Sequence, residues 1–158
     1  MIHLTQRKAT INDLPFIVQL LSEDELGQTR EIYTTDINTC YQTAFEKINI
    51  DPNQYLMVIC TNEKVIGTCH LTLMPSLTYQ GSMRMQIEAV RIAKNYRGQK
   101  LGEWMMQQAF DYAKQHDVKM IQLTTNKLRP RAKQFYEHLG FQASHEGMKY
   151  FLDDHNVE

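Results

Sequence analysis

The sequence predicts an α/β fold in which a mixed sheet carries helices on both of its faces. Three observations predict this fold class. The hydrophobic period switches several times between that of a strand and that of a helix, paired strands occupy the middle of the chain, and a strand–helix–strand crossover occupies the second half. The length of 158 residues suits one domain, so we expect a single domain over residues 1–152 and a polar C-terminal tail at residues 153–158.

Strands are expected where short runs alternate apolar and polar side chains, or stay apolar between turn residues. Seven segments have these properties: residues 2–9, 54–60, 65–74, 83–92, 118–125, 141–145 and 148–152. A polar turn at residues 61–64 joins the second and third segments, and Pro75 and Gly81 mark the loop before the fourth. The last two segments are expected to pair with each other at the end of the chain.

Four helices are expected from apolar side chains at helical spacing. Asn12 and Asp13 suit the N-cap of the first helix, Pro15 lies in its first turn, and Gly27 is expected to end it. The other three helices carry the apolar stripes of residues 37–48, 101–112 and 132–139. The predicted order of elements is therefore β-α-α-β-β-β-α-β-α-β-β.

The composition excludes several classes of protein. Seventeen Lys and Arg against eighteen Asp and Glu give a formal charge of −1, which argues against a dedicated nucleic-acid binder. The longest apolar run, residues 55–60, is far shorter than the roughly 20 residues that span a bilayer. Cys40, Cys60 and Cys69 show no metal-ligand spacing, so we expect no metal and no disulfide framework. With no signal-peptide pattern, the cytoplasm is the expected location.

The fourth expected strand changes its face near Ala89. Apolar side chains occupy the odd positions up to Ala89 and the even positions Val90 and Ile92 after it. One extra residue, a β-bulge, would produce such a flip and leave backbone groups available to a ligand. A central strand covered on both faces at its end would produce the same pattern. The sequence alone leaves both interpretations open.

A glycine turn, residues 97–102, follows this strand and precedes the third expected helix. Gly98 and Gly102 let the backbone turn tightly, and a helix start presents unpaired N–H groups that suit a phosphate. Arg97 and Lys100 add positive charge. An ordinary glycine turn that caps a helix explains the same residues, and neither a Walker A loop nor the GxGxxG pattern is present.

Three segments together resemble the GCN5-related N-acetyltransferase (GNAT) family. Residues 87–102 are similar to its coenzyme-binding motif R/Q-x-x-G-x-G/A, residues 123–126 to its strand ending in Asn, and residues 132–141 to its A-x-x-F/L-Y-x-x-x-G-F segment. These segments cover about half of the chain in the order and spacing of the family. One departure is Lys100, which stands where most members have the middle glycine of the motif.

The resemblance implies a GNAT-like acyl-CoA N-acyltransferase fold and acetyl-CoA as the acetyl donor. By this carry-over, the backbone of Val90, Arg91 and Ile92 would pair with the pantetheine arm, and Asn126 would contact the pantetheine or adenine side. The pyrophosphate would lie near Arg97, on the backbone amides of Gly98, Gln99, Lys100, Leu101 and Gly102.

The resemblance also suggests which residues carry the chemistry. Glu88 would act as general base toward the amine, through a water molecule, and the Val90 N–H would stabilise the oxyanion. Tyr136 would protonate the departing thiolate, since a tyrosine stays protonated near neutral pH. The residues alone also allow a surface glutamate at 88 and a core tyrosine at 136. His70 either lines the acceptor pocket or is a structural histidine.

The predicted function is an acetyl-CoA-dependent N-acetyltransferase whose acceptor is a primary amine of a small molecule or a peptide. The alternative is a non-catalytic module that binds or senses acyl-CoA. A third possibility, an RNA-associated protein, would use four cations between residues 127 and 133, and the near-zero net charge argues against it. Homodimers are frequent in the family, and the sequence determines neither the acceptor nor the oligomeric state.

Overall fold

The computed structural model describes residues 2–34 and 36–153. They fall into two compact units, divided between Gln122 and Leu123, and each is described here by itself. The first unit contains the sheet, and the second contains one helix and extended chain. That residues 1–152 form one domain stays a prediction, and all but Asp153 of the expected tail lies outside the described residues.

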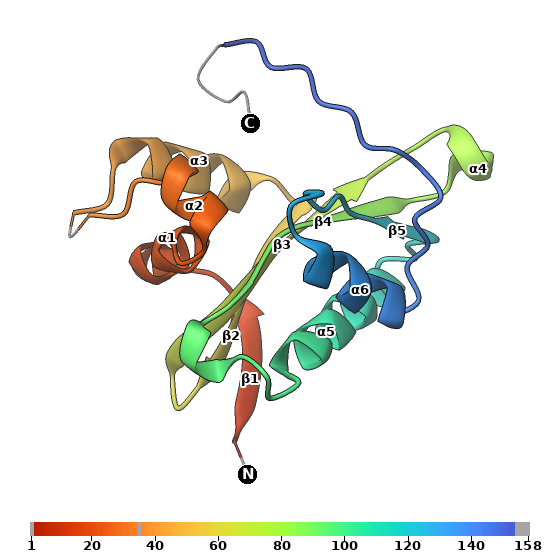
Figure 1. Ribbon diagram of the computed structural model, residues 1–158. Helices are drawn as coiled ribbons and strands as arrows, with labels where there is room; N and C mark the ends of the chain where they lie inside the picture. Colours follow the sequence, from red (N-terminus) through yellow and green to blue (C-terminus); the bar gives the residue numbers. More distant parts are fainter. Residues whose placement is uncertain (1, 35, 154–158) are drawn as a thin grey trace. The chain divides into compact units, whose positions relative to one another are not determined.

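A five-stranded mixed sheet forms the centre of the first unit (Figure 1). Its strands are β1 (Leu4–Lys8), β2 (Gln54–Thr61), β3 (Lys64–Met74), β4 (Arg84–Ile92) and β5 (Met120–Gln122). They lie in the order β1-β2-β3-β4-β5, with antiparallel pairing up to β4 and parallel pairing between β4 and β5. The mixed sheet predicted from the sequence is therefore confirmed.

Helices cover both faces of the sheet, as the fold class requires (Figure 1). One face carries α1 (Leu14–Ser22), α2 (Glu25–Arg30) and α3 (Thr39–Ile50), and the other carries α5 (Leu101–Gln115). Short elements complete the first unit: η1 (Ile11–Asp13), α4 (Thr78–Gly81) and η2 (Lys94–Tyr96). The second unit contains α6 (Pro130–His138).

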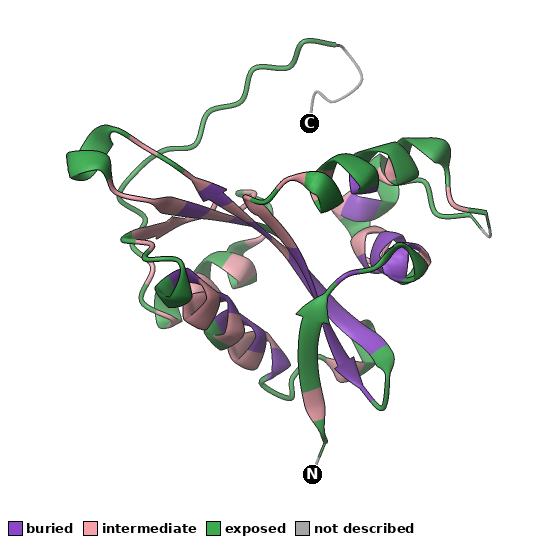
Figure 2. Cartoon of the chain, turned by 180° about the vertical axis from the view of Figure 1, so that it is seen from behind, coloured by how far each residue is buried: buried purple, intermediate pink, exposed green. Residues whose placement is uncertain are grey.

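The alternation of side chains along β2 divides the core between the two faces. Leu56, Val58 and Cys60 pack with buried side chains of α1 and α3. The odd-numbered side chains of β2 point to the opposite face, where the ring of Tyr55 lies 4.7 Å from the ring of Tyr112 in α5. Both faces of β2 and β3 are consequently buried along most of their length (Figure 2).

The first helix differs from its prediction at both ends. Asp13 does not cap α1 with its side chain; it closes a capping box with Thr10 around η1 and accepts two hydrogen bonds from Arg7, at 2.6 and 2.9 Å. Gly27 does not end the helix, because α1 stops at Ser22 and Asp24 begins α2 by accepting a hydrogen bond from the Gly27 N–H. Gly27 is buried instead, at a close approach to the end of α1.

The expected strands after residue 117 are also corrected. The strand expected over residues 118–125 is limited to the three residues of β5, and residues 141–145 and 148–152 form no strand in the part of the chain that the structure describes. A period-two pattern shows that a segment can form a strand, but the strand exists only where a neighbour supplies hydrogen bonds. Met148, Tyr150 and Leu152, which lie in the second of these segments, are almost fully exposed.

Candidate active site

A β-bulge interrupts β4 at the position where the sequence pattern changes face. Glu88 pairs with His70 and Arg91 pairs with Thr68, so two residues of β4, Ala89 and Val90, lie opposite one residue of β3. Ala89 adopts a left-handed backbone with a φ of 53°. The bulge interpretation is therefore confirmed, and the strand bends directly after Glu88.

Gly67 of β3 allows the two strands to approach closely beside the bulge. A Cβ atom at this position would lie 2.8 Å from a side-chain atom of Ile59, 2.8 Å from a side-chain atom of Ile92 and 3.0 Å from the Arg91 carbonyl oxygen. All three distances are too short for a carbon atom in a packed core. The absence of a side chain at Gly67 therefore helps to fix the path of β4.

β4 and β5 separate before β4 ends. Their pairing stops at Gln86 and Gln122, and no further strand pairs with that edge of β4 among the described residues. The Ala93 N–H donates to Ile66 on the β3 side, so the carbonyl of the preceding residue, Ile92, points to the open edge. Residues 87–92 therefore form an unpaired strand edge within the first unit.

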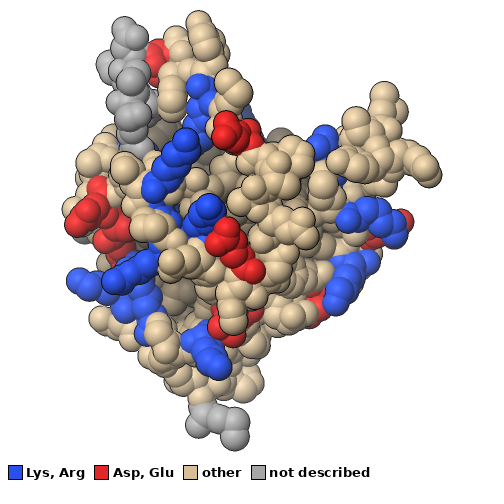
Figure 3. Space-filling view, turned by 45° about the vertical axis from the view of Figure 1, so that its right-hand side comes forward, with Lys and Arg blue, Asp and Glu red and all other residues tan. Residues whose placement is uncertain are grey.

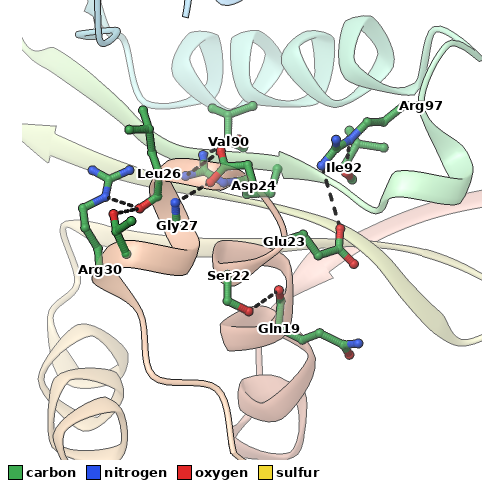
Figure 4. A network of polar contacts seen from close by, with 12 residues as sticks. Gln19, Ser22, Glu23, Asp24, Leu26, Gly27, Arg30, Val90, Ile92 and Arg97 are labelled. Atoms are coloured by element: carbon green, nitrogen blue, oxygen red, sulfur yellow. Dashed lines mark hydrogen bonds and ion pairs between the residues drawn. The ribbon is translucent and has the colours of Figure 1, made fainter. Parts of the chain in front are cut away.

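Two arginines occupy backbone acceptors of this segment. The Val90 carbonyl accepts a hydrogen bond of 2.9 Å from the Arg91 guanidinium, and the Ile92 carbonyl accepts one of 3.0 Å from Arg97 Nε (Figure 4). Arginine side chains thus provide donors that a partner strand would otherwise supply.

The connection between α1 and α2 holds both guanidinium groups. Asp24 Oδ2 lies 3.8 Å from Arg91 Nη2, and Glu23 Oε2 lies 3.8 Å from Arg97 Nη2 (Figure 4). Glu23 also accepts a hydrogen bond of 3.2 Å from the Lys94 backbone N–H. The two acidic side chains, each 25% exposed, therefore link this connection to the end of β4.

The turn between η2 and α5 has the geometry of an anion site. Gly98 and Lys100 both adopt a left-handed backbone, with φ of 78° and 60°, and Lys100 is the N-cap of α5. Among the described residues, the backbone amides from Gly98 to Glu103 have no hydrogen-bond acceptor. These exposed amides lie at the positive end of a helix of 15 residues, which favours negative charge.

Polar side chains cross the sheet on the face that carries α1 to α3. The register places all of them on the face of Leu56, and we call this set the polar strip: Gln54, His70, Thr72, Arg84, Gln86, Glu88 and Gln122. Gln122 donates a 2.9 Å hydrogen bond to Gln86 and accepts one of 3.4 Å from Arg84. The polar strip therefore reaches the bulge at Glu88.

Glu88 and His70 are neighbours across the β3–β4 ladder within this strip. The Glu88 side chain is 55% exposed, whereas that of His70 is 14% exposed, and His70 Nδ1 lies 3.8 Å from Glu88 Oε1. Burial lowers the pKa of His70, and the carboxylate of Glu88 acts in the opposite direction. His70 is thus a nearly buried imidazole that is mainly neutral at pH 7.

The two remaining candidate residues belong to the second unit. Tyr136 lies on α6, partly buried, with its ring edge-on to Phe135 at 5.2 Å and to Phe141 at 5.8 Å. Asn126 does not end a strand as expected, because β5 stops four residues earlier, and its Oδ1 accepts a hydrogen bond from the Leu128 N–H in a turn. The structure brings the other predicted site residues together in the first unit.

The neighbours of these residues do not follow from the sequence. The links of Glu23 and Asp24 to arginines, and of Gln54 to His70, join segments that lie 16 to 74 positions apart. One signal was present, because Arg84, Gln86 and Glu88 alternate with apolar residues along β4. That alternation predicts a polar face, but the partners of this face follow only from the strand register.

Comparisons with known proteins identify the family of this chain. The profile of the Acetyltransferase (GNAT) family matches residues 17–141, which is most of the chain. A crystal structure from Bacillus halodurans C-125, described as a transcriptional regulator, is 45% identical, with a TM-score of 0.92 over 95% of this chain and 100% of that one. The match of the family profile defines the protein as an acyltransferase enzyme, and the chain belongs to the GNAT acetyltransferase family.

Two further relatives carry acetyltransferase names. The aminoalkylphosphonate N-acetyltransferase of Salmonella typhimurium is 27% identical over 105 residues, which are 66% of this chain and 68% of that protein. The crystal structure of glucosamine-6-phosphate N-acetyltransferase from Arabidopsis thaliana has a TM-score of 0.74 at 22% identity, covering 96% of this chain and 99% of that one. The second likeness concerns the fold alone.

Two kinds of feature are absent from the described residues. No helix within residues 2–34 and 36–153 has the length and apolar character needed to cross a membrane. The same residues contain no group of three or more His, Cys, Asp and Glu side chains that could hold a metal ion. On the face drawn in Figure 3, basic and acidic side chains both occur, in keeping with the formal charge of −1.

Proposed function

We propose that the protein transfers the acetyl group of acetyl-CoA to a primary amine of a small molecule or a peptide, by direct attack of the amine on the thioester. One observation carries this proposal: β4 is bulged at Ala89 and Val90, and among the described residues its edge on the β5 side has no partner strand beyond Gln86. The amides at the start of α5 follow it in the chain. An open strand edge suits an amide-rich arm, and a helix start suits a diphosphate.

In this proposal the donor replaces interactions that the protein makes with itself. The pantetheine amides hydrogen-bond the backbone of Val90, Arg91 and Ile92, where guanidinium groups now donate to two carbonyls. The released Arg97 and the unpaired amides of the turn then bind the pyrophosphate. These amides belong to Gly98, Gln99, Lys100, Leu101 and Gly102. Asn126 contacts the pantetheine or adenine side.

The acetyl transfer requires one base, one oxyanion donor and one acid. Glu88 accepts a proton from the amine through water, and the nitrogen lone pair forms the new C–N bond. The Val90 N–H stabilises the oxyanion, a contribution of about 3 kcal/mol for such donors. As the C–S bond breaks, Tyr136 gives its phenolic proton to the thiolate, and solvent restores that proton.

The polar strip suggests the kind of amine that binds. Arg84 forms no ion pair with a carboxylate among the described residues, and its buried Nε has no hydrogen-bond partner. A guanidinium on the same face as Glu88 suits an acceptor that carries a phosphonate, phosphate or carboxylate group. Two relatives are named for acceptors with such a group, an aminoalkylphosphonate and glucosamine 6-phosphate.

The decisive experiment combines coenzyme binding with thiol release. Calorimetry should show saturable acetyl-CoA binding, and an amine panel that includes 2-aminoethylphosphonate and its uncharged analogue ethanolamine should show CoA release. Glu88→Gln should slow the transfer by roughly 10²- to 10⁴-fold, while the exposed-site control Glu63→Gln keeps the wild-type rate. Arg84→Gln should raise KM for the phosphonate more than for ethanolamine.

A second candidate function is binding of acyl-CoA without turnover. The Bacillus halodurans relative described as a transcriptional regulator favours keeping it in the test. This candidate predicts coenzyme binding with no thiol release for any amine of the panel. Absence of coenzyme binding would contradict both candidates.

A further inference from the structure

A line of polar contacts runs across three segments behind the proposed base. Gln54 Nε2 donates a 3.1 Å hydrogen bond to Asp51 Oδ2, and Gln54 Oε1 lies 2.6 Å from His70 Nε2. On the other side of the imidazole, Nδ1 lies 3.8 Å from Glu88 Oε1. His70 is therefore held between an amide and a carboxylate, on a ladder whose register fixes its backbone.

The chemistry of this line determines where the imidazole carries its proton. The carboxylate of Asp51 can only accept, so it requires the NH2 group of Gln54 on its side. The Gln54 oxygen then faces His70 and requires an N–H at Nε2. A neutral His70 consequently has its unprotonated Nδ1 toward Glu88, and two acceptors face each other with room for one proton between them.

Other charges do not compete for this proton. Glu88 on β4 is the only charged group found to act on the His70 imidazole among the described residues, and the β2 side presents the neutral Gln54 with Asp51 behind it. The residues beside His70 on its own strand, Cys69 and Leu71, are completely buried and point to the opposite face.

We infer that His70 is the positioning residue of the proposed base and shares with Glu88 the proton that leaves the acceptor amine. This inference rests on the proposed function of Glu88. Because Glu88 is half-exposed, a small rotation of its side chain would shorten the 3.8 Å separation to a hydrogen bond once the proton is present.

The proton balance of the step is simple. The amine loses one proton as its lone pair attacks the thioester carbonyl, and the Glu88–His70 pair changes from a charge of −1 to zero. The shared proton lies between Glu88 Oε1 and His70 Nδ1, while the Nε2–H of His70 stays hydrogen-bonded to Gln54 Oε1. Solvent at the exposed side of Glu88 then removes the extra proton and restores the pair.

The first arm of the test follows the His70 ring by NMR and needs no substrate. His70→Gln identifies the resonance among the six histidines. Glu88→Gln should lower the pKa of His70, because it removes the carboxylate that favours the imidazolium, and the control Glu63→Gln should leave it unchanged. An unchanged His70 titration in Glu88→Gln would overturn the inference.

The second arm is a double-mutant cycle on CoA release with 2-aminoethylphosphonate. His70→Gln keeps a donor for Gln54 but cannot take up a proton. It should slow the transfer about tenfold, which is a fraction of what general-base catalysis supplies. It should also alter the acidic limb of the pH–rate profile. The coenzyme affinity should stay unchanged. The double variant with Glu88→Gln should be no slower than Glu88→Gln alone, because His70 acts through Glu88.

The outcomes separate the two proposals. If the losses of transfer rate add in the double variant, or if the pH–rate profile of His70→Gln runs parallel to that of the wild type, His70 has a purely structural role. The proposed acetyltransferase activity would be unaffected by that result. A wild-type protein that binds acetyl-CoA and releases no CoA with any amine would remove the proposed function and this inference with it.

Discussion

Lys100 provides a direct test of how the glycine turn at residues 97–102 is built. It adopts φ 60° and ψ 17° at the N-cap of α5, a left-handed conformation that disfavours every residue with a Cβ atom. Most members of the family have glycine here, and the backbone explains that preference. We expect Lys100→Gly to stabilise the protein and Lys100→Ala not to do so.

The comparison of these two variants isolates the backbone contribution. Both remove the same exposed ammonium group, so any effect of charge cancels between them. The left-handed conformation costs an L-residue about 1–2 kcal/mol, and glycine loses part of this advantage through the greater freedom of its unfolded chain. We therefore expect the glycine variant to exceed the alanine variant by about 1 kcal/mol, or about 2–4 °C in Tm.

Urea denaturation and thermal unfolding measure this difference. The two variants should differ in the urea concentration at the midpoint of unfolding. The dependence of the unfolding free energy on urea should stay unchanged, since neither variant alters the buried surface. Calorimetry with acetyl-CoA should show the same loss of affinity in both variants, because both lack the same cation. Equal stability of the two variants would refute the strain of the left-handed turn, and a loss of coenzyme binding in the glycine variant alone would refute the proposal that the lysine contributes only its charge.

Three further predictions concern packing, pH and thiol reactivity. The hydrogen bonds from Arg7 hold the pKa of Asp13 below its usual value of 3.8. The ionised Asp13 therefore stabilises the folded protein above pH 4, and this contribution is lost as the pH falls through the lowered pKa. Asp13→Asn should lower the free energy of unfolding, measured in urea at pH 7, by about 2 kcal/mol and make it less dependent on pH in the acid range. Gly67→Ala should destabilise by about 1–3 kcal/mol through overpacking and weaken acetyl-CoA binding, whereas unchanged stability would contradict the close strand approach. Ellman's reagent should react fast with one thiol, that of the exposed Cys40, and Cys40→Ser should remove this reaction. Cys69 should react slowly, because burial raises the pKa of its thiol to about 12. A fast reaction of Cys69 would contradict its burial.

The sequence predicted those elements that depend only on residues adjacent in the chain. The periodicity of residues 101–112 located α5, and the change of face at Ala89 located the bulge, because both are properties of adjacent side chains. The break between α1 and α2 was missed, because the prediction placed the helix end at Gly27, whereas the side chain of Asp24 caps a new helix there. The terminal strands were predicted wrongly, because alternation reports the capacity to pair and not the presence of a partner.

The candidate site shows the same division. Glu88 and the glycine turn were identified from a contiguous motif, and their roles stay predictions. The facing of His70 and Glu88 follows from how β3 and β4 align, which the pattern along either strand alone does not specify. The contact of Gln54 with His70 likewise depends on how β2 and β3 align, which turn residues alone do not specify.

The two arginines that hydrogen-bond the end of β4 have a consequence for the solubility of the protein. An unpaired strand edge attracts other chains, and folded proteins protect such edges with charge. Arg91 and Arg97 hydrogen-bond the carbonyls that an incoming strand would use, and Asp24 and Glu23 hold them in position. These contacts therefore shield this strand edge from edge-to-edge self-association, and in the proposed complex the donor would take over that protection.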